Sequence, residues 1–178
     1  MLKKTATFDP GDGLPPYRLN VGLVLRNAEG LIFSGKRSDQ AGAQDGWQLP
    51  QGGIDVGEAP DRAALRELAE EVGPNVRADI VAVYPRPLSY DFRDFEGPRR
   101  IFGGKYRGQM QHWFYLDMRS PEADIDITRS YDGDPPEFST YAWRTPVEIL
   151  RDIVAVKRPI YTEVLDYLAR CIILPTAP

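Results

Sequence analysis

The sequence predicts a single domain of the α/β (α+β) class, because two kinds of segment occur along it. Short apolar runs between turn residues, such as 17–25 and 111–118, have the length and composition of β-strands. Patterns at 60–72 and 159–171 have the spacing of amphipathic α-helices. A chain of 178 residues, 42% hydrophobic and 27% charged, can bury a substantial core around such elements.

The first half of the chain is expected to begin with an extension and to continue into paired strands. Residues 1–16 contain Gly, Pro and Asp with little periodicity, which indicates either a mobile extension or a strap across the surface. Turn residues at 27–30 separate the apolar runs 17–25 and 31–33, so these runs are predicted to pair as strands. Residues 34–46 are polar and glycine-rich, and we expect a loop there.

The second half is expected to add strands and two C-terminal helices. Apolar runs at 80–84 and 111–118 predict strands, and 125–127 predicts an edge strand. Residues 85–108 are long, aromatic and basic, which is typical of a loop that is functional or mobile. The sequence Thr-Pro-Val-Glu at 145–148 has the pattern of a capping box with Pro at the first helical position, so a short helix should begin there.

Composition and charge exclude two kinds of site and argue against one mode of binding. One cysteine, Cys171, excludes an internal disulfide, and a single histidine, His112, excludes a zinc site built from His and Cys. A net charge of −4 argues against broad coating of nucleic acid, so a phosphate-bearing partner would bind at one local site. His112 falls in a predicted strand beside a tryptophan, and we expect it to be a packed residue rather than an acid/base catalyst.

The boundaries and location follow from the same features. The domain is expected at 17–170, after the extension at 1–16 and before a tail at 171–178. No apolar run approaches the length of a membrane span, and residues 1–13 lack a secretory signal. We therefore expect a cytoplasmic protein with no membrane partner, present as a monomer or a small homo-oligomer.

Three glutamates gather on one face of the helix expected at 60–72. Glu67, Glu70 and Glu71 are neighbours on a helical surface and repel one another there. Nothing in helix formation requires them, whereas Mg²⁺ or Mn²⁺ prefers such oxygen ligands and is commonly shared with the phosphates of a substrate. The alternative is a solvated face on which these residues form weak surface pairs with arginines. The stripe expected to pack against the core consists of Leu65, Leu68 and Val72.

The spacing around these glutamates favours the metal hypothesis. Seven positions between Gly52 and Gly73 follow one pattern, and at roughly 7% usage each they would coincide by chance about once in 10⁸ starts. The stretch resembles the Nudix box, G-x5-E-x7-R-E-U-x-E-E-x-G-U, at every fixed position, with Pro74 where the family has an aliphatic residue. The resemblance implies a Nudix fold, in which a mixed β-sheet is sandwiched between helices with the catalytic loop and helix.

The same resemblance implies the chemistry and the metal site. Nudix enzymes hydrolyse a diphosphate linkage to a nucleoside with Mg²⁺, for which Mn²⁺ can substitute. Arg66 would orient the glutamates, and Glu58 would brace the loop against the helix. Water activated by the metal would attack phosphorus in line, and Glu70 and Glu137 are both candidates for its general base. The implied metal ligands are the carbonyl of Gly52 and the carboxylates of Glu67, Glu70, Glu71 and Glu137.

Motifs outside the box resemble one Nudix branch. They are YRLNVG from 17, WQLPQGG from 47, GQMQHWF from 108, PEF from 136 and KRPIY from 157. That branch holds the bacterial RNA pyrophosphohydrolases and the asymmetric diadenosine tetraphosphate hydrolases. Members often have Pro at Leu19 and Lys at Met110 and His112, so positive charge near the substrate channel is reduced here. The implied substrate-binding residues are Arg18, Arg37, Gln51, Tyr90, Gln111, Lys157, Arg158 and Tyr161.

Three functions remain open from the sequence. The first is Mg²⁺-dependent hydrolysis of a phosphoanhydride bond in a dinucleoside polyphosphate or at the 5′-triphosphate end of RNA, which releases a mononucleotide or pyrophosphate. The second is a Nudix hydrolase for another nucleoside diphosphate-linked substrate of the ADP-ribose type. The third is a non-catalytic nucleotide-binding Nudix domain, and the intact glutamates argue against it.

Overall fold

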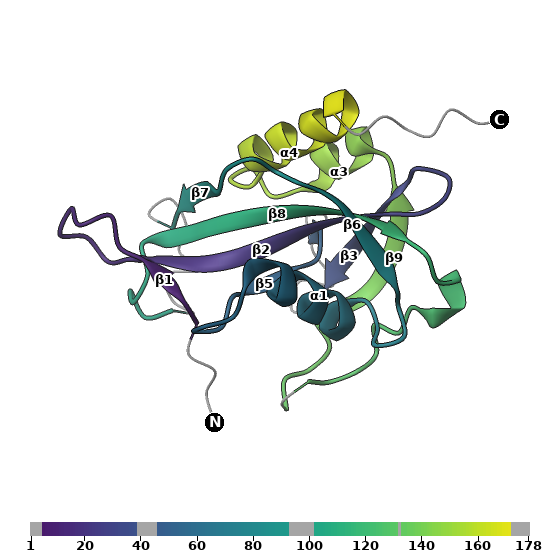
Figure 1. The fold of residues 1–178 in the computed structure, drawn as a ribbon, viewed down its shortest axis with the longest axis horizontal. Helices are drawn as coiled ribbons and strands as arrows, with labels where there is room; N and C mark the ends of the chain where they lie inside the picture. Colours follow the sequence, from purple (N-terminus) through teal and green to yellow (C-terminus); the bar gives the residue numbers. More distant parts are fainter. Residues whose placement is uncertain (1–4, 39–45, 93–101, 132, 172–178) are drawn as a thin grey trace.

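A central sheet organises the fold, and in the computed structural model the described residues are 5–38, 46–92, 102–131 and 133–171 (Figure 1). The sheet follows the order β4-β3-β2-β8-β6, with β1 and β5 paired to β2, β7 to β8 and β9 to β3. Only β2 and β8 are parallel among the pairs in the described residues, so the sheet is mixed. The strands are β1 (Thr7–Phe8), β2 (Tyr17–Arg26), β3 (Ile32–Arg37), β4 (Trp47–Gln48), β5 (Gln51–Gly53), β6 (Ala78–Val83), β7 (Leu88–Asp91), β8 (Gly108–Met118) and β9 (Phe138–Arg144).

Helices cover both faces of this sheet, as the Nudix resemblance predicts (Figure 1). On one face α1 (Pro60–Glu71) packs with Leu23 and Phe114 in one apolar cluster. On the other face α3 (Pro146–Asp152) and α4 (Arg158–Cys171) pack in a second cluster. The strands β2 and β8 supply residues to both clusters because successive side chains of a strand point to opposite faces.

The helix predictions at the C-terminal end are confirmed. The capping box at the start of α3 is complete, since Thr145 accepts from the Glu148 backbone and the Glu148 side chain accepts from the Thr145 backbone. In α4 the residues Ile160, Val164 and Leu168 are buried on one face. None of the helices in the described part of the chain is both long and apolar enough to span a bilayer.

The loop predicted at 34–46 begins later than expected. Strand β3 continues to Arg37 because it pairs with β9, a strand that the sequence analysis did not predict. Gly35 lets the two strands pack closely, since a Cβ at this position would overlap the ring of Phe138. Residues 39–45 lie outside the described ranges.

Two further predictions need correction. The edge strand predicted at 125–127 is absent; the segment follows a 3-10 turn (Glu122–Asp124), and Asp126 accepts from the backbone and hydroxyl of Thr128. This side-chain turn replaces strand pairing. The loop predicted at 85–108 contains a strand, β7, which pairs with β8; residues 93–101 lie outside the described ranges.

Candidate active site

The site is built where β5 passes between α1 and β2. Gly52 and Gly53 pair with Val21 and Asn20 of β2. Because glycine has no side chain, groups from other elements can approach the backbone on both faces of β5. A Cβ on Gly52 would overlap the carboxyl group of Glu67, and a Cβ on Gly53 would overlap the guanidinium of Arg18. The two glycines therefore let a carboxylate and an arginine approach the same strand from opposite faces.

Arg66 joins the loop to the helix. Its Nε and Nη2 donate to the two carboxylate oxygens of Glu58 at 2.9 and 2.8 Å, and Nη2 also donates to the carbonyl of Gly53 at 2.7 Å. Its Nη1 donates to Glu67 at 2.6 Å and to Glu70 at 3.4 Å. This bidentate pairing is the geometry that fixes orientation most strongly. The positions match the bracing and orienting roles that the Nudix resemblance implies for Glu58 and Arg66.

Glu67 is the buried glutamate of α1, while Glu70 and Glu71 are partly exposed. Glu67 is only 7% exposed, and its pKa is raised to about 7, chiefly by burial. Burial also raises the pKa of Glu71 well above its usual range, and the carboxylates of Glu137 and Glu67 add to the rise. Glu71 accepts the backbone N–H of Gln51 at 3.0 Å, which joins the helix to β5. These carboxylates therefore lie close enough to raise one another's pKa, although burial is the larger cause.

This set of donors fits a hard divalent cation in its chemistry. Buried carboxylates that raise one another's pKa would be stabilised in their charged form by Mg²⁺ or Mn²⁺. Within the described ranges, no three His, Cys, Asp or Glu side chains lie close enough to hold a metal ion in the present arrangement. Glu58, Glu67 and Glu70 are gathered around Arg66 instead.

A second charged cluster lies beside the first. Arg37, at the end of β3, forms an ion pair with Glu137, which precedes β9. Gln48 connects this pair to Lys157, the residue before α4, because its amide donates to Glu137 at 3.4 Å and its carbonyl accepts from the Lys157 Nζ at 3.0 Å. Burial, followed by the charge of Arg37, lowers the pKa of Lys157 to about 8. Three residues predicted from separate motifs are thus brought together.

A row of hydrogen-bonded amide side chains lies on the face of the sheet that carries α4. Gln111 on β8 donates to Gln51 at 3.0 Å and to Asn20 and Gln109 at 3.3 Å. The hydroxyl of Tyr90 donates to Gln109 at 3.0 Å. Because β2 and β8 run parallel, Asn20 lies opposite Gln111 in the same register. Their mutual hydrogen bonds hold these groups in place, and Asn20, Gln109 and Gln111 are at most 7% exposed.

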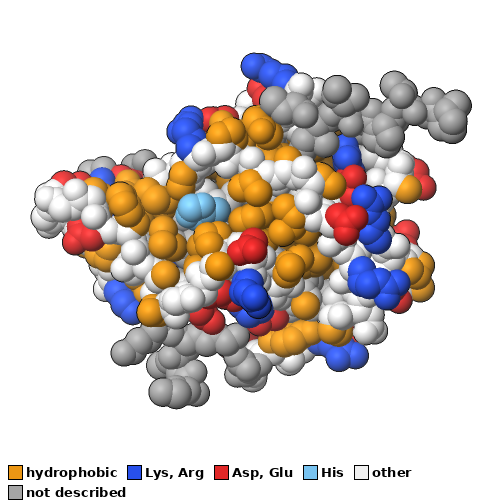
Figure 2. Space-filling model, viewed as in Figure 1, with side chains coloured by type: hydrophobic (Ala, Val, Ile, Leu, Met, Phe, Trp, Pro, Cys, Tyr) orange, Lys and Arg blue, Asp and Glu red, His pale blue; other side chains and the backbone are white. Residues whose placement is uncertain are grey.

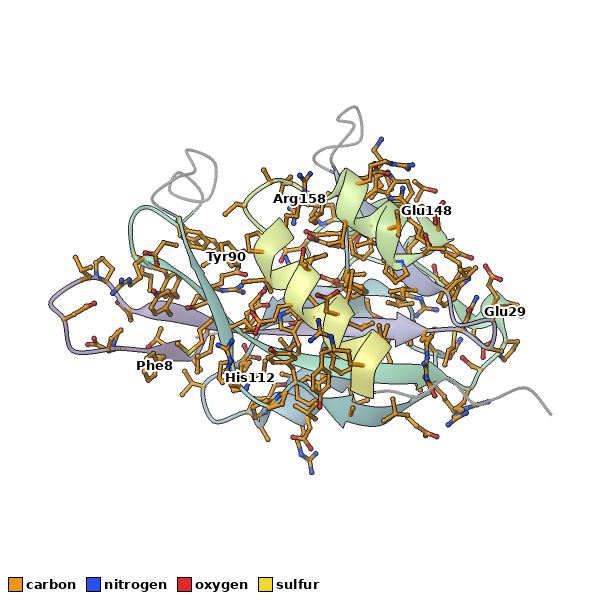
Figure 3. The ribbon with its side chains drawn as sticks, turned by 90° about the horizontal axis from the view of Figure 1, so that it is seen from above. Phe8, Glu29, Tyr90, His112, Glu148 and Arg158 are labelled. Atoms are coloured by element: carbon orange, nitrogen blue, oxygen red, sulfur yellow. The ribbon has the colours of Figure 1, made fainter. Side chains whose placement is uncertain are left out.

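The structure does not place every predicted residue at an accessible position. Tyr161 is 0% exposed, packs edge-on against Trp113 at 5.4 Å and accepts the backbone N–H of Leu49 at 3.1 Å. Tyr161 therefore stabilises the backbone just after β4. Its burial does not favour the predicted contact with substrate. Arg158, the first residue of α4, is exposed (Figure 3).

His112 is partly buried, and burial lowers its pKa. Figure 2 shows it among hydrophobic side chains on the face that carries α1. This environment agrees with the packing role expected for it.

Three polar residues of the candidate site were not predicted from the sequence. Asn20, Gln48 and Gln109 are at most 7% exposed and bond to predicted site residues. They lie in strands β2, β4 and β8. A buried amide requires partners, so a polar residue next to the apolar residues of a strand was the available signal.

The comparisons with known proteins define the class. A family model described as NUDIX domain matches residues 16–164, so the chain belongs to the Nudix family. It is 45% identical over 150 residues to the RNA pyrophosphohydrolase of Erythrobacter litoralis, which covers 84% of this chain and 88% of that protein. It is 41% identical over 157 residues to Nudix hydrolase 25 of Arabidopsis thaliana, covering 86% and 87%. The protein is a Nudix pyrophosphohydrolase, as the sequence predicts.

Solved structures support the fold assignment alone, because their sequence identities are low. The dihydroneopterin triphosphate pyrophosphohydrolase of E. coli has a TM-score of 0.60 at 17% identity and covers 84% of this chain and 97% of its own. An Ap4A hydrolase of C. elegans has a TM-score of 0.57 at 17% identity and covers 85% and 98%. The sheet between helices is thus shared across enzymes with different named substrates.

Proposed function

We propose that this enzyme hydrolyses the 5′-triphosphate end of RNA and releases pyrophosphate or phosphate. The observation that carries the proposal is the 45% identity to a named RNA pyrophosphohydrolase over 84% of the chain. The complete set of glutamates at Glu67, Glu70 and Glu71 supports catalysis rather than binding alone. A substrate of this kind agrees with the cytoplasmic location expected from the sequence.

The proposed metal is Mg²⁺, with Mn²⁺ as a substitute. Its ligands would come from the glutamates of α1, the carbonyl of Gly52 and Glu137, which are hard oxygen donors. When bound, the metal neutralises the polyphosphate and activates the attacking water. Arg66 keeps two roles in this proposal: it orients Glu67 and Glu70, and it holds the Gly53 carbonyl at 2.7 Å.

The positive side chains would receive the phosphates. Arg18 lies against Gly53, and Lys157 and Arg37 converge near Gln48 and Glu137. Their guanidinium and ammonium groups would stabilise charge that develops on the departing phosphates. Either Glu70 or Glu137 would accept the proton of the attacking water, and replacing each by glutamine distinguishes them.

A second candidate substrate is a dinucleoside polyphosphate such as diadenosine tetraphosphate. The observation in its favour is a group of aromatic rings next to Arg18. The guanidinium of Arg18 lies 5.5 Å from the ring centre of Phe102, which stacks on Phe92 at 5.5 Å, and Tyr90 contacts Phe92 edge-on at 5.9 Å. Aromatic faces of this kind can stack a base, and a dinucleotide has a second base to place.

The decisive experiment compares the two substrates in one preparation. Turnover of a short 5′-triphosphorylated RNA and of diadenosine tetraphosphate is measured with Mg²⁺ and then with Mn²⁺, and the products are identified. Faster release of pyrophosphate or phosphate from RNA supports the first proposal. Faster formation of ATP and AMP supports the second. Turnover of ADP-ribose alone would reject both.

A further inference from the structure

The N-terminal strap, residues 5–16, meets the catalytic loop in a closed junction. The backbone N–H of Leu19 donates to the carbonyl of Ala6 at 2.9 Å, and the N–H of Ala6 donates to the carbonyl of Ile54 at 2.7 Å. The N–H of Ile54 in turn donates to the carbonyl of Leu19 at 3.1 Å. Three segments far apart in sequence are therefore joined in a ring of three backbone hydrogen bonds.

The junction holds the part of the loop that leads to the carboxylates. On one side of Ile54, the carbonyl of Gly53 accepts a hydrogen bond from Arg66. On the other side, the backbone N–H of Asp55 donates to Glu58 at 3.0 Å. Asp55 also forms an isolated bridge with Thr5 of the strap. Each residue from 53 to 55 thus makes a backbone hydrogen bond. The carbonyl of Ile54 accepts its hydrogen bond from the strap, at the N–H of Ala6.

The strap also lies beside Arg18. Thr7 is opposite Arg18 in the β1–β2 pair, and the Cγ2 of Thr5 approaches Gly53 on the side where the guanidinium of Arg18 lies. Its other end is anchored, since Asp12 pairs with Arg107. The backbone N–H of Arg107 also donates to the carbonyl of Pro16 at 3.1 Å. The family match begins at residue 16, so residues 5–15 of the strap are outside the matched residues.

We propose that the strap is a positioning element of the metal site, and that Ala6 is its positioning residue. By fixing the carbonyl of Ile54, it restricts the loop that carries the Gly52 and Gly53 carbonyls and the brace to Glu58. A loop ordered in advance loses less conformational entropy when a cation binds, so the strap strengthens metal binding without touching the metal. This inference rests on the proposed function for the identity of the site.

A pair of proline variants tests the proposal. Ala6→Pro removes the N–H that donates to Ile54 and keeps the carbonyl that accepts from Leu19. Thr7→Pro is the matched control: the Ala6–Leu19 bond makes Thr7 and Arg18 a non-hydrogen-bonded pair, so the N–H of Thr7 points away from β2. Metal binding is measured by calorimetric titration with Mn²⁺, with the thermal midpoint of each variant recorded.

The expected result is a loss of Mn²⁺ affinity of about 3- to 10-fold in Ala6→Pro, which is the effect of one net hydrogen bond. Thr7→Pro should stay within about 2-fold of the parent, since no bond is lost. Hydrogen exchange at residues 51–58 should be faster in Ala6→Pro alone. Equal Mn²⁺ affinity and equal exchange in the two variants would overturn the proposal.

A measurement on the unmodified chain keeps the proposal testable if Ala6→Pro does not fold. Coupling between two sites is reciprocal, so metal binding must stabilise the strap as the strap stabilises metal binding. Addition of Mg²⁺ should slow hydrogen exchange of residues 5–8, while residues 160–168 of α4 serve as the reference. Protection of 51–58 without protection of 5–8 would overturn the inference.

The result also separates the inference from the proposed function. If the chain binds Mn²⁺ and hydrolyses neither RNA nor dinucleotide, the proposed function fails, and the exchange data still decide the role of the strap. If turnover is normal and 5–8 are unaffected by metal, the function stands and the strap is only structural.

Discussion

Helices α1 and α4 pack apolar residues on opposite faces of the same sheet, but within their described residues only α1 also buries a charged side chain. In α4, Ile160 and Val164 are 6% and 0% exposed, as its apolar spacing predicts. In α1, Leu65 is 45% exposed while Glu67 is 7% exposed. A helix packed for stability alone would bury the leucine and expose the glutamate. The buried carboxylate therefore distinguishes α1, which carries the candidate site, from α4, which follows the apolar pattern.

The largest effect is expected on the charged face of α1. Glu70→Gln should lower kcat by about 10²- to 10⁴-fold, because the amide can neither accept the proton of water nor bind a hard cation as strongly. Steady-state kinetics with saturating Mg²⁺ give the value, and circular dichroism checks that the helix content is unchanged. A near-normal rate would remove Glu70 from the mechanism and weaken the contrast between the helices.

The matching change in α4 should affect stability instead. Leu165 is 2% exposed, and Leu165→Ala should lower the free energy of unfolding by about 2–5 kcal/mol through lost burial and a cavity. Chemical denaturation measures the loss. Below the unfolding transition, kcat and KM should equal those of the parent. A fall in kcat for folded protein would mean that α4 also shapes the reacting groups.

A smaller kinetic effect is expected at Glu137, which lies outside α1. The carboxylate is paired with Arg37 and is 33% exposed, so it is more accessible than Glu67. Glu137→Gln should raise the Mg²⁺ concentration needed for half-maximal rate and lower kcat by about 10- to 100-fold. Unchanged turnover with an unchanged Mg²⁺ requirement would exclude it as a metal ligand. The result tells whether α1 alone supplies the carboxylates.

Lys157, the residue before α4, contributes a charged group whose effect depends on pH. Lys157 has a pKa lowered to about 8, so it is protonated below that pH and loses its charge as the pH rises through it. If it binds phosphate, kcat/KM should fall by about 3- to 10-fold between about pH 7 and 9. Lys157→Arg should remove this fall, because a guanidinium stays charged. An identical pH profile in both proteins would rule out Lys157 as the titrating group.

The sequence predicted the local contacts of the candidate site better than its packing. The spacing from Gly52 to Gly73 predicted that Arg66 and Glu58 join the loop to the helix, and the structure contains these contacts, which are local along one loop and one helix. The capping box and the apolar face of α4 were predicted for the same reason. Local chemistry is sufficient where both partners lie within a few turns of each other. The role of the glutamates as metal ligands stays a prediction.

Contacts between distant segments could not be read in this way. Strand β9 has no partner near it in sequence, and its pairing with β3 converted residues expected in a loop into strand. The burial of Glu67 depends on the close approach of Gly52, which only the assembled sheet provides. The junction of Ala6, Leu19 and Ile54 is made of backbone groups, which no side-chain pattern records.

The smallest effect is expected from the exposed leucine of α1. Leu65→Ala should change the free energy of unfolding by no more than about 0.5 kcal/mol, because the side chain is 45% exposed and alanine is an equally good helix former. Denaturation at two protein concentrations measures it. A loss above about 2 kcal/mol that grows with concentration would show that a second copy covers Leu65. Leu65 would then lie in an interface between two copies of the chain. Helix α1 would in that case have one apolar side against the sheet, a second against the other copy, and a third side with the glutamates.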